Sequence, residues 1–148
     1  MTQYDKQAKD YLDKYGLKID WLYMGRSKYF DDDKETRDVY TFVLRRMGRA
    51  ANGELCDIPN APRFSGKFGN SINDSNEQPG KHPSAYSLLA SLSGDVNIPD
   101  NFEDFCSYYG YDTDSIKALK SWKRCDKYAK RLRVFLTKEM QEELQEIQ

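Results

Sequence analysis

The sequence has few of the side chains that build common metal and nucleophilic sites. Its 148 residues include one histidine, His82, and three cysteines, Cys56, Cys106 and Cys125. A single histidine excludes a Cys2His2 zinc site, and the cysteine spacing fits neither a CxxC metal knuckle nor a paired disulfide framework. We interpret the thiols as reduced, small buried hydrophobes and His82 as a loop residue. The alternatives are a Cys3His site or a cysteine-protease pair, and no spacing in the sequence favours either.

Long apolar runs are also missing. No stretch approaches the roughly 20 apolar residues of a membrane helix, and residues 1–16 are polar and acidic, unlike a secretory signal. The composition is 39% hydrophobic and 32% charged, which is too rich in apolar residues for charge-driven disorder. We expect one globular domain over residues 1–148, located in the cytoplasm where it is made.

Familiar catalytic and cofactor motifs are absent. The glycine-containing segment GKFGNS at residues 66–71 has the spacing of neither a P-loop nor a dinucleotide fingerprint. There is no GxSxG elbow and no HxE followed by PCxxC. We therefore predict no enzyme activity and no cofactor.

Two groups of acidic residues suggest metal ligands at first sight. Asp31, Asp32 and Asp33 begin an acidic run that lacks the glycine and glutamate positions of an EF-hand, so we predict an exposed hairpin turn that keeps a sheet edge soluble. Asp112 and Asp114 stand at the predicted start of a helix, where capping explains them, and the N-cap candidates there are Thr113, Asp114 and Ser115. We predict no metal site.

The first half of the chain has the residue patterns of β-strands. A short amphipathic helix is predicted over residues 4–15. Strands are predicted over 18–24 and 63–69, where the residues alternate between two faces, and over 39–47, which is rich in β-branched and aromatic residues. Residues 48–62 carry turn residues throughout and are predicted to be a flexible loop insertion. Short connections between the strands favour an antiparallel meander.

The second half is predicted to be helical. Short helices are expected over residues 84–92 and 100–109, and Thr137 begins a last one. Between them a long amphipathic helix is predicted over residues 114–136, with an apolar stripe that starts at Ile116 and continues at intervals of three or four. Strands followed by helices indicate an α+β domain: a three-stranded antiparallel sheet with an N-terminal helix, and then a helical C-terminal half.

The long helix carries most of the local charge. Residues 117–138 contain nine basic residues and one acid, leaving 14 basic and 23 acidic residues elsewhere, although the whole chain has a net charge of −1. Several of the bases repeat every three or four residues and so share one helical face. The candidate partner-contact residues on this helix are Lys117, Lys120, Lys123, Arg124, Lys127, Lys130 and Arg131.

Three interpretations of this charge stay open. A solvated face whose bases pair with acids elsewhere in the fold is the simplest. The same face suits nucleic-acid phosphates, since each neutralised phosphate releases counterions, or an acidic protein surface. A separate aromatic group has the composition of a binding hot spot, and it consists of Tyr108, Tyr109 and Tyr111 with Phe102 and Phe105. We expect most of these five rings to be core and only one or two to be exposed.

Four segments of the chain resemble a set of small bacteriophage- and prophage-encoded proteins. They are FGNSIND (68–74), PSAYSLLASL (83–92), FEDFCSYYGYDTDSIKA (102–118) and YFDDDKETRDVYTFVLRR (29–46). The loop at 48–62 is longer than this set would suggest. The resemblance implies a bacterial host cytoplasm as the setting, and no catalytic residue is carried over from it.

By analogy with small phage proteins that lack catalytic motifs, we expect a non-enzymatic accessory or anti-defence protein, for example an anti-CRISPR protein. It would bind a host protein or nucleoprotein complex, with the basic face as one contact surface and Asp31, Asp32 and Asp33 in another. The alternative is a nucleic-acid-binding accessory protein that uses the helix at residues 117–133 on phosphates.

Overall fold

The computed structural model of the chain describes residues 2–28, 36–71 and 82–147. These residues form two compact units, Met1–Leu88 and Leu89–Gln148. The first unit contains helix α1 (Gln3–Tyr15), the long strands β1 (Leu17–Lys28), β2 (Thr36–Arg46) and β5 (Arg63–Ser71), and the short strands β3 (Gly48–Arg49) and β4 (Leu55–Cys56). The predicted α+β class and the N-terminal helix are confirmed.

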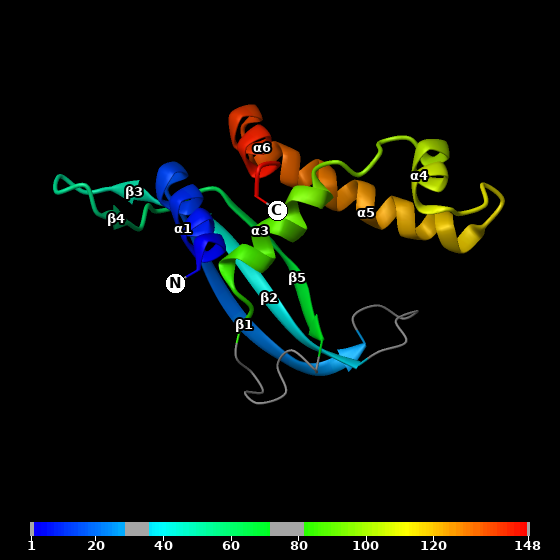
Figure 1. Cartoon of the computed structure of the whole chain (residues 1–148), viewed down its shortest axis with the longest axis horizontal. Helices are drawn as coiled ribbons and strands as arrows, with labels where there is room; N and C mark the ends of the chain where they lie inside the picture. The colour runs from blue at the N-terminus through cyan, green and yellow to red at the C-terminus, as the bar shows by residue number, and fades with distance from the viewer. Residues whose placement is uncertain (1, 29–35, 72–81, 148) are drawn as a thin grey trace. The chain divides into compact units, whose positions relative to one another are not determined.

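The three long strands form one antiparallel sheet in the order β1-β2-β5, as predicted (Figure 1). Aromatic and aliphatic residues of alternate positions pack on one face, where Tyr40, Phe42 and Leu44 of β2 are fully buried. Trp21 of β1 contacts Tyr40 edge-on, with ring centroids 5.9 Å apart. Residues at alternate positions of β2 therefore form the buried face of the sheet.

Helix α1 joins β1 through Gly16, which adopts a left-handed backbone with φ 61°. A Cβ atom there would lie 3.3 Å from the carbonyl oxygen of Met47, so the turn favours glycine for both its backbone and its space. Thr2 caps the other end of α1 in a capping box with Asp5, which satisfies two of the free amide groups of the first turn.

Residues 48–62, predicted to be loop, include regular structure. Strands β3 and β4 pair there as a two-stranded hairpin. Arg49 donates hydrogen bonds to the backbone oxygens of Gly53 and Asp13, so one guanidinium ties the hairpin to the last turn of α1. The polar composition of this segment hid the hairpin because two-residue strands carry too few residues to show alternation.

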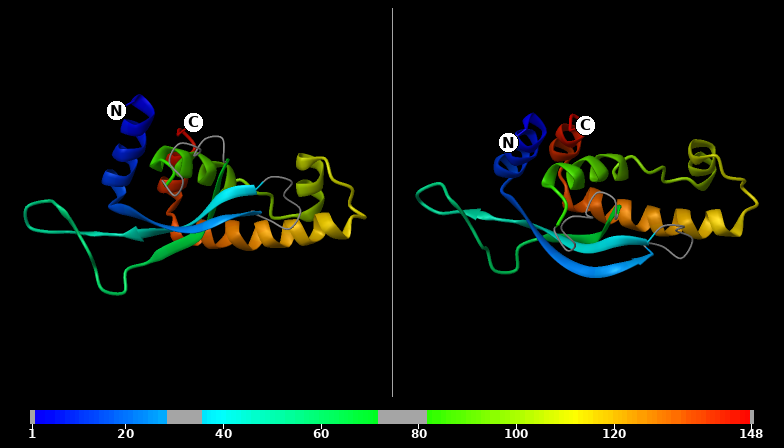
Figure 2. Two further views of the ribbon diagram at one scale, coloured as in Figure 1. Left: turned by 90° about the horizontal axis from the view of Figure 1, so that it is seen from below. Right: turned by 60° about the horizontal axis from the view of Figure 1, so that its bottom comes forward.

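The second unit contains helices α4 (Phe102–Tyr109), α5 (Ile116–Phe135) and α6 (Lys138–Leu144), while α3 (Ala85–Asp95) runs across the boundary between the units. α4 packs beside α5, and α6 follows the C-terminal end of α5 (Figures 1 and 2). Ile98, Phe105 and Ala129 are the buried centre of this packing. The helix starts agree closely with prediction because the side chains of Asn101, Ser115 and Thr137 cap them.

Two details at the start of α5 correct the prediction. The helix is capped by Ser115, whose Oγ accepts from the amide of Ala118 at 3.1 Å, so Asp112 and Asp114 lie before the helix and are not its cap. Ile116, predicted to begin the apolar stripe, is 73% exposed. The stripe is half-buried at Leu119, Trp122 and Cys125 and is fully buried only from Ala129 onward.

Candidate functional site

Helix α5 presents its basic residues to solvent. We define the basic face as the seven residues predicted as partner contacts on this helix. Every one of them is exposed: Lys117, Lys120, Lys123, Arg124, Lys127, Lys130 and Arg131. The opposite side of the helix holds the buried residues Ala118, Ala129, Leu132 and Phe135. The predicted clustering on one face is therefore present in the structure.

The described residues do not pair every base of this face with an acid. Asp126 is the one acid within α5, and its Oδ2 lies 2.8 Å from the Nζ atom of Lys130. Lys120, Lys123 and Lys127 have no ion pair with any residue that the structure describes. Arg131 lies over the ring of Tyr128, 5.9 Å from its centroid. Among the described residues, the basic face is thus not fully paired with acids.

Arg133 belongs to the helix but not to the basic face. Its Nε donates to the carbonyl oxygen of Val96 at 3.0 Å, and its Nη2 donates to that of Ile98 at 2.5 Å. The guanidinium therefore satisfies two backbone acceptors of the segment after α3 and is half-buried. The charge pattern of the sequence does not distinguish Arg133 from the exposed basic residues. The difference arises because the side of α5 that carries Arg133 packs against the segment after α3.

The second predicted contact surface, Asp31, Asp32 and Asp33, lies outside the described residues. The strands β1 and β2 on either side of it are described and pair with each other as far as Lys28 and Thr36. The contact role of the three aspartates stays a prediction.

The tyrosine group near α4 is more exposed than predicted. Tyr108, Tyr109 and Tyr111 are 76%, 47% and 49% exposed, where only one or two exposed rings were expected. Beneath them Phe105 is buried, with its ring centroid 4.7 Å from that of Tyr109. The left-handed Gly110 ends α4 between these tyrosines, so the chain turns there and leaves the rings at the surface.

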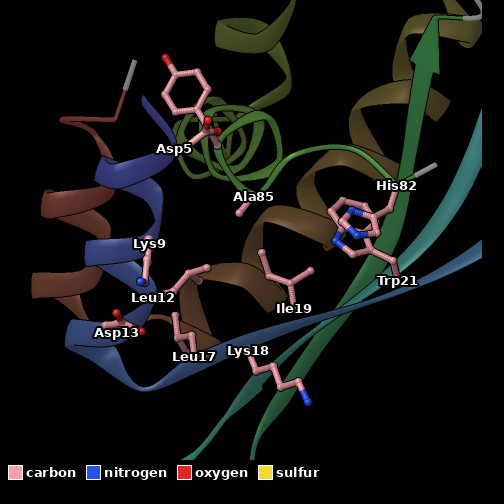
Figure 3. Close-up of a pocket in the computed structure, with 11 residues that line it drawn as sticks. Asp5, Lys9, Leu12, Asp13, Leu17, Lys18, Ile19, Trp21, His82 and Ala85 are labelled. Carbon is pink, nitrogen blue, oxygen red and sulfur yellow. The ribbon is translucent and has the colours of Figure 1, made fainter. Parts of the chain in front are cut away.

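The first unit has a hollow of about 390 Å³ between α1, β1 and the start of α3 (Figure 3). Leu12, Leu17 and Ile19 line its apolar part. At one end the ring of His82 stacks on Trp21, with centroids 5.7 Å apart and planes within 2°. His82 is thus a stacking residue, a role that its sequence neighbourhood did not signal because Trp21 is 61 residues away.

A buried carboxylate on the sheet forms the clearest polar network of the first unit. Asp38 is fully buried, and its Oδ1 accepts from Tyr23 Oη at 2.9 Å and Arg26 Nε at 3.0 Å. The hydrogen bond to Asp38 raises the pKa of Tyr23. Sequence reasoning missed this network, since the register shift between Tyr23 and Gly25 is what brings Arg26 opposite Asp38.

The cysteines are free thiols. Cys106 is buried and Cys125 is half-buried, while Cys56 is exposed. Burial raises the pKa of Cys106 and of Cys125, which keeps these thiols protonated and unreactive at neutral pH. Within residues 2–28, 36–71 and 82–147, no three His, Cys, Asp or Glu side chains come together as a set of metal ligands.

The comparisons with known proteins add no family. No protein-family model, curated protein or solved structure matches this chain.

In the part of the chain that the structure describes, no helix has both the length and the apolar character needed to cross a bilayer. Because its seven basic residues are all exposed on one side of the helix, the basic face of α5 is the best-defined candidate site.

Proposed function

We propose that the protein is a non-enzymatic binding protein whose basic face engages an anionic partner. The observation that carries this proposal is the exposure of all seven basic residues on one side of α5. A face of one sign attracts a partner of the opposite sign over several ångströms and speeds its association. The one acid of the helix, Asp126, is buried beside Lys130, while Lys120, Lys123 and Lys127 have no ion pair among the described residues.

The biological role that we propose is that of a phage accessory or anti-defence protein acting in the bacterial cytoplasm. The resemblance of the four sequence segments to phage and prophage proteins supports this setting. The partner would be a host protein or a nucleoprotein complex. Anti-CRISPR activity is one example of such a role, since a protein that blocks a defence complex by binding to it needs no catalytic residue.

A comparative pull-down tests the proposal. Tagged wild-type protein and the variant Lys120→Glu/Arg124→Glu/Lys127→Glu are exposed to the same bacterial lysate, and bound material is identified by mass spectrometry. A control variant with the same change in charge, Lys6→Glu/Lys9→Glu/Lys18→Glu, alters exposed residues of the first unit. We expect partners that are retained by the wild type and the control but lost from the α5 variant. Equal retention by all three proteins would refute the basic face as the contact surface.

A further inference from the structure

The composition of the basic face distinguishes between kinds of anionic partner. Its seven residues are five lysines and two arginines, and the only other exposed residues of α5 are Ile116 and Val134, at its two ends. Lysine is depleted from protein–protein interfaces relative to the rest of the surface, whereas it is a common contact to phosphate. A face without acids, amides or hydroxyls also lacks the mixed pattern by which protein surfaces recognise each other.

The density of charge along α5 is similar to that of one phosphodiester strand along the axis of a duplex. From Lys117 to Arg131 the helix rises about 21 Å, and the seven side chains spread over an arc of about 140°. This is about one positive charge for every 3 Å of helix axis, and one strand of a duplex carries one phosphate for roughly every 3.4 Å of the duplex axis. Carboxylates held on a folded protein surface at that density would repel each other strongly.

We infer that the basic face binds the phosphodiester backbone of a nucleic acid without reading its sequence. This inference rests on the proposed function and names the chemistry of its partner. Lys120, Lys123 and Lys127 lie within the face and have no ion pair among the described residues, so their ammonium groups meet phosphates without first breaking a protein contact. The exposed side chains include no asparagine or glutamine to pair with adenine. Contacts to phosphate hold a protein on the duplex but carry no sequence information.

Fluorescence anisotropy with the full-length protein tests the inference. The probes are two labelled DNA duplexes of about 20 base pairs, one AT-rich and one GC-rich, and a labelled poly-L-glutamate of similar charge, each titrated between about 50 and 200 mM salt. We expect both duplexes to bind with affinities within about threefold of each other. The slope of log affinity against log salt should be about −4 to −6, because up to seven phosphates are neutralised at about −0.9 each. Poly-L-glutamate should bind at least about tenfold more weakly.

Three variants locate the contact. Lys120→Glu/Arg124→Glu/Lys127→Glu should lose at least about tenfold in duplex affinity and flatten the slope. The control Lys6→Glu/Lys9→Glu/Lys18→Glu should lose less than about threefold. Ile116→Ser/Val134→Ser keeps the charge and should bind the duplexes as the wild type does. Circular dichroism and thermal melting establish that each variant is folded before binding is compared.

The outcomes separate this inference from the proposed function. Poly-L-glutamate binding as tightly as DNA, with the same dependence on the α5 residues, would overturn the phosphate inference and leave a protein partner for the basic face. Loss of duplex binding in the Ile116/Val134 variant, or tenfold discrimination between the two duplexes, would also overturn it. Binding of neither probe at the lowest salt would overturn the inference, and the pull-down with the α5 variant would then decide the proposed function by itself.

Discussion

The carboxylate of Asp126 and the ammonium of Lys130 form an ion pair of 2.8 Å one turn apart on α5. Asp126 is 8% exposed, so the single acid of this helix neutralises one lysine from beneath and does not interrupt the surface that the other bases share. Its second oxygen, Oδ1, has no hydrogen-bond partner among the described residues. The ion pair therefore lowers the net charge of the basic face by one but leaves its basic side chains exposed.

Replacing this acid should strengthen binding to a polyanion. Asp126→Asn frees Lys130 and raises the charge of α5 by one, so we expect duplex affinity at about 50 mM salt to rise by about two- to threefold and the salt slope to steepen by up to about one. The control Asp114→Asn removes an exposed acid outside the helix and should change affinity less. Anisotropy measures both. An unchanged affinity in Asp126→Asn would show that Lys130 is not part of the contact.

Arg133 should prove structural rather than a contact residue. Arg133→Lys keeps the charge but cannot donate to both Val96 and Ile98, so we expect unfolding free energy to fall by about 1–2 kcal/mol. Duplex affinity should stay within about twofold. Arg131→Lys on the exposed face is the matched control and should change stability by less than about 0.5 kcal/mol. Urea unfolding followed by circular dichroism compares the two variants, and equal stability would contradict the assignment.

The buried carboxylate of Asp38 should stabilise the sheet. Asp38→Ala leaves the Arg26 guanidinium and the Tyr23 hydroxyl without their acceptor. Because the Arg26 side chain is 39% exposed, water compensates part of the loss, and we expect a cost of about 2 kcal/mol rather than the larger cost of a fully buried pair.

Asp20 provides the control for this experiment. Its Oδ2 accepts from Arg45 Nε at 2.6 Å, but its side chain is 46% exposed, so Asp20→Ala should cost less than about 1 kcal/mol. Chemical denaturation measures both costs. If the two alanine variants were equally stable, burial would not explain the importance of Asp38.

Asp95 should make stability depend on pH. Its carboxyl is half-buried at the end of α3, and desolvation raises its pKa to about 6. The usual value of an unfolded chain is about 3.9, so the folded state holds the proton more tightly. The group therefore destabilises the fold above pH 6, and this penalty is lost as the pH falls from about 6 towards 4.

The variant Asp95→Asn removes this titration. We expect it to be more stable than the wild type by about 3 kcal/mol at pH 7, by about half as much at pH 5, and by only about 0.5 kcal/mol at pH 4. Thermal or urea unfolding at the three pH values measures the difference, in which the other titrating groups cancel. A difference that did not change with pH would rule out a raised pKa for Asp95.

Most of the architecture was predictable from local sequence signals. Alternation identified β1 and β5, and a high content of β-branched and aromatic residues identified β2. The 3.6-residue period, with Ser115 and Thr137 as caps, identified α5 and α6. Each of these signals is carried by residues close together in the sequence, so the elements can be predicted without knowledge of the tertiary fold. The basic face followed from the same period, because exposed and buried sides of a helix alternate predictably.

The features that the sequence did not reveal depend on distant partners. The role of Arg133 requires the path of the chain at Val96, and the burial of Asp38 requires a β-bulge that places Arg26 opposite it. The stacking of His82 on Trp21 joins two segments far apart in the chain. Each of these is a tertiary relationship that neither spacing nor composition encodes.

The most direct test of the central claim is to map the contact by NMR. In 1H–15N spectra of the full-length protein titrated with a DNA duplex of about 20 base pairs at about 50 mM salt, the account predicts that the largest shifts occur along α5 between Lys117 and Arg131. Signals of α1 and of the β-sheet should change little. Saturable shifts centred on another element, with α5 unchanged, would contradict the assignment of the basic face as the binding surface.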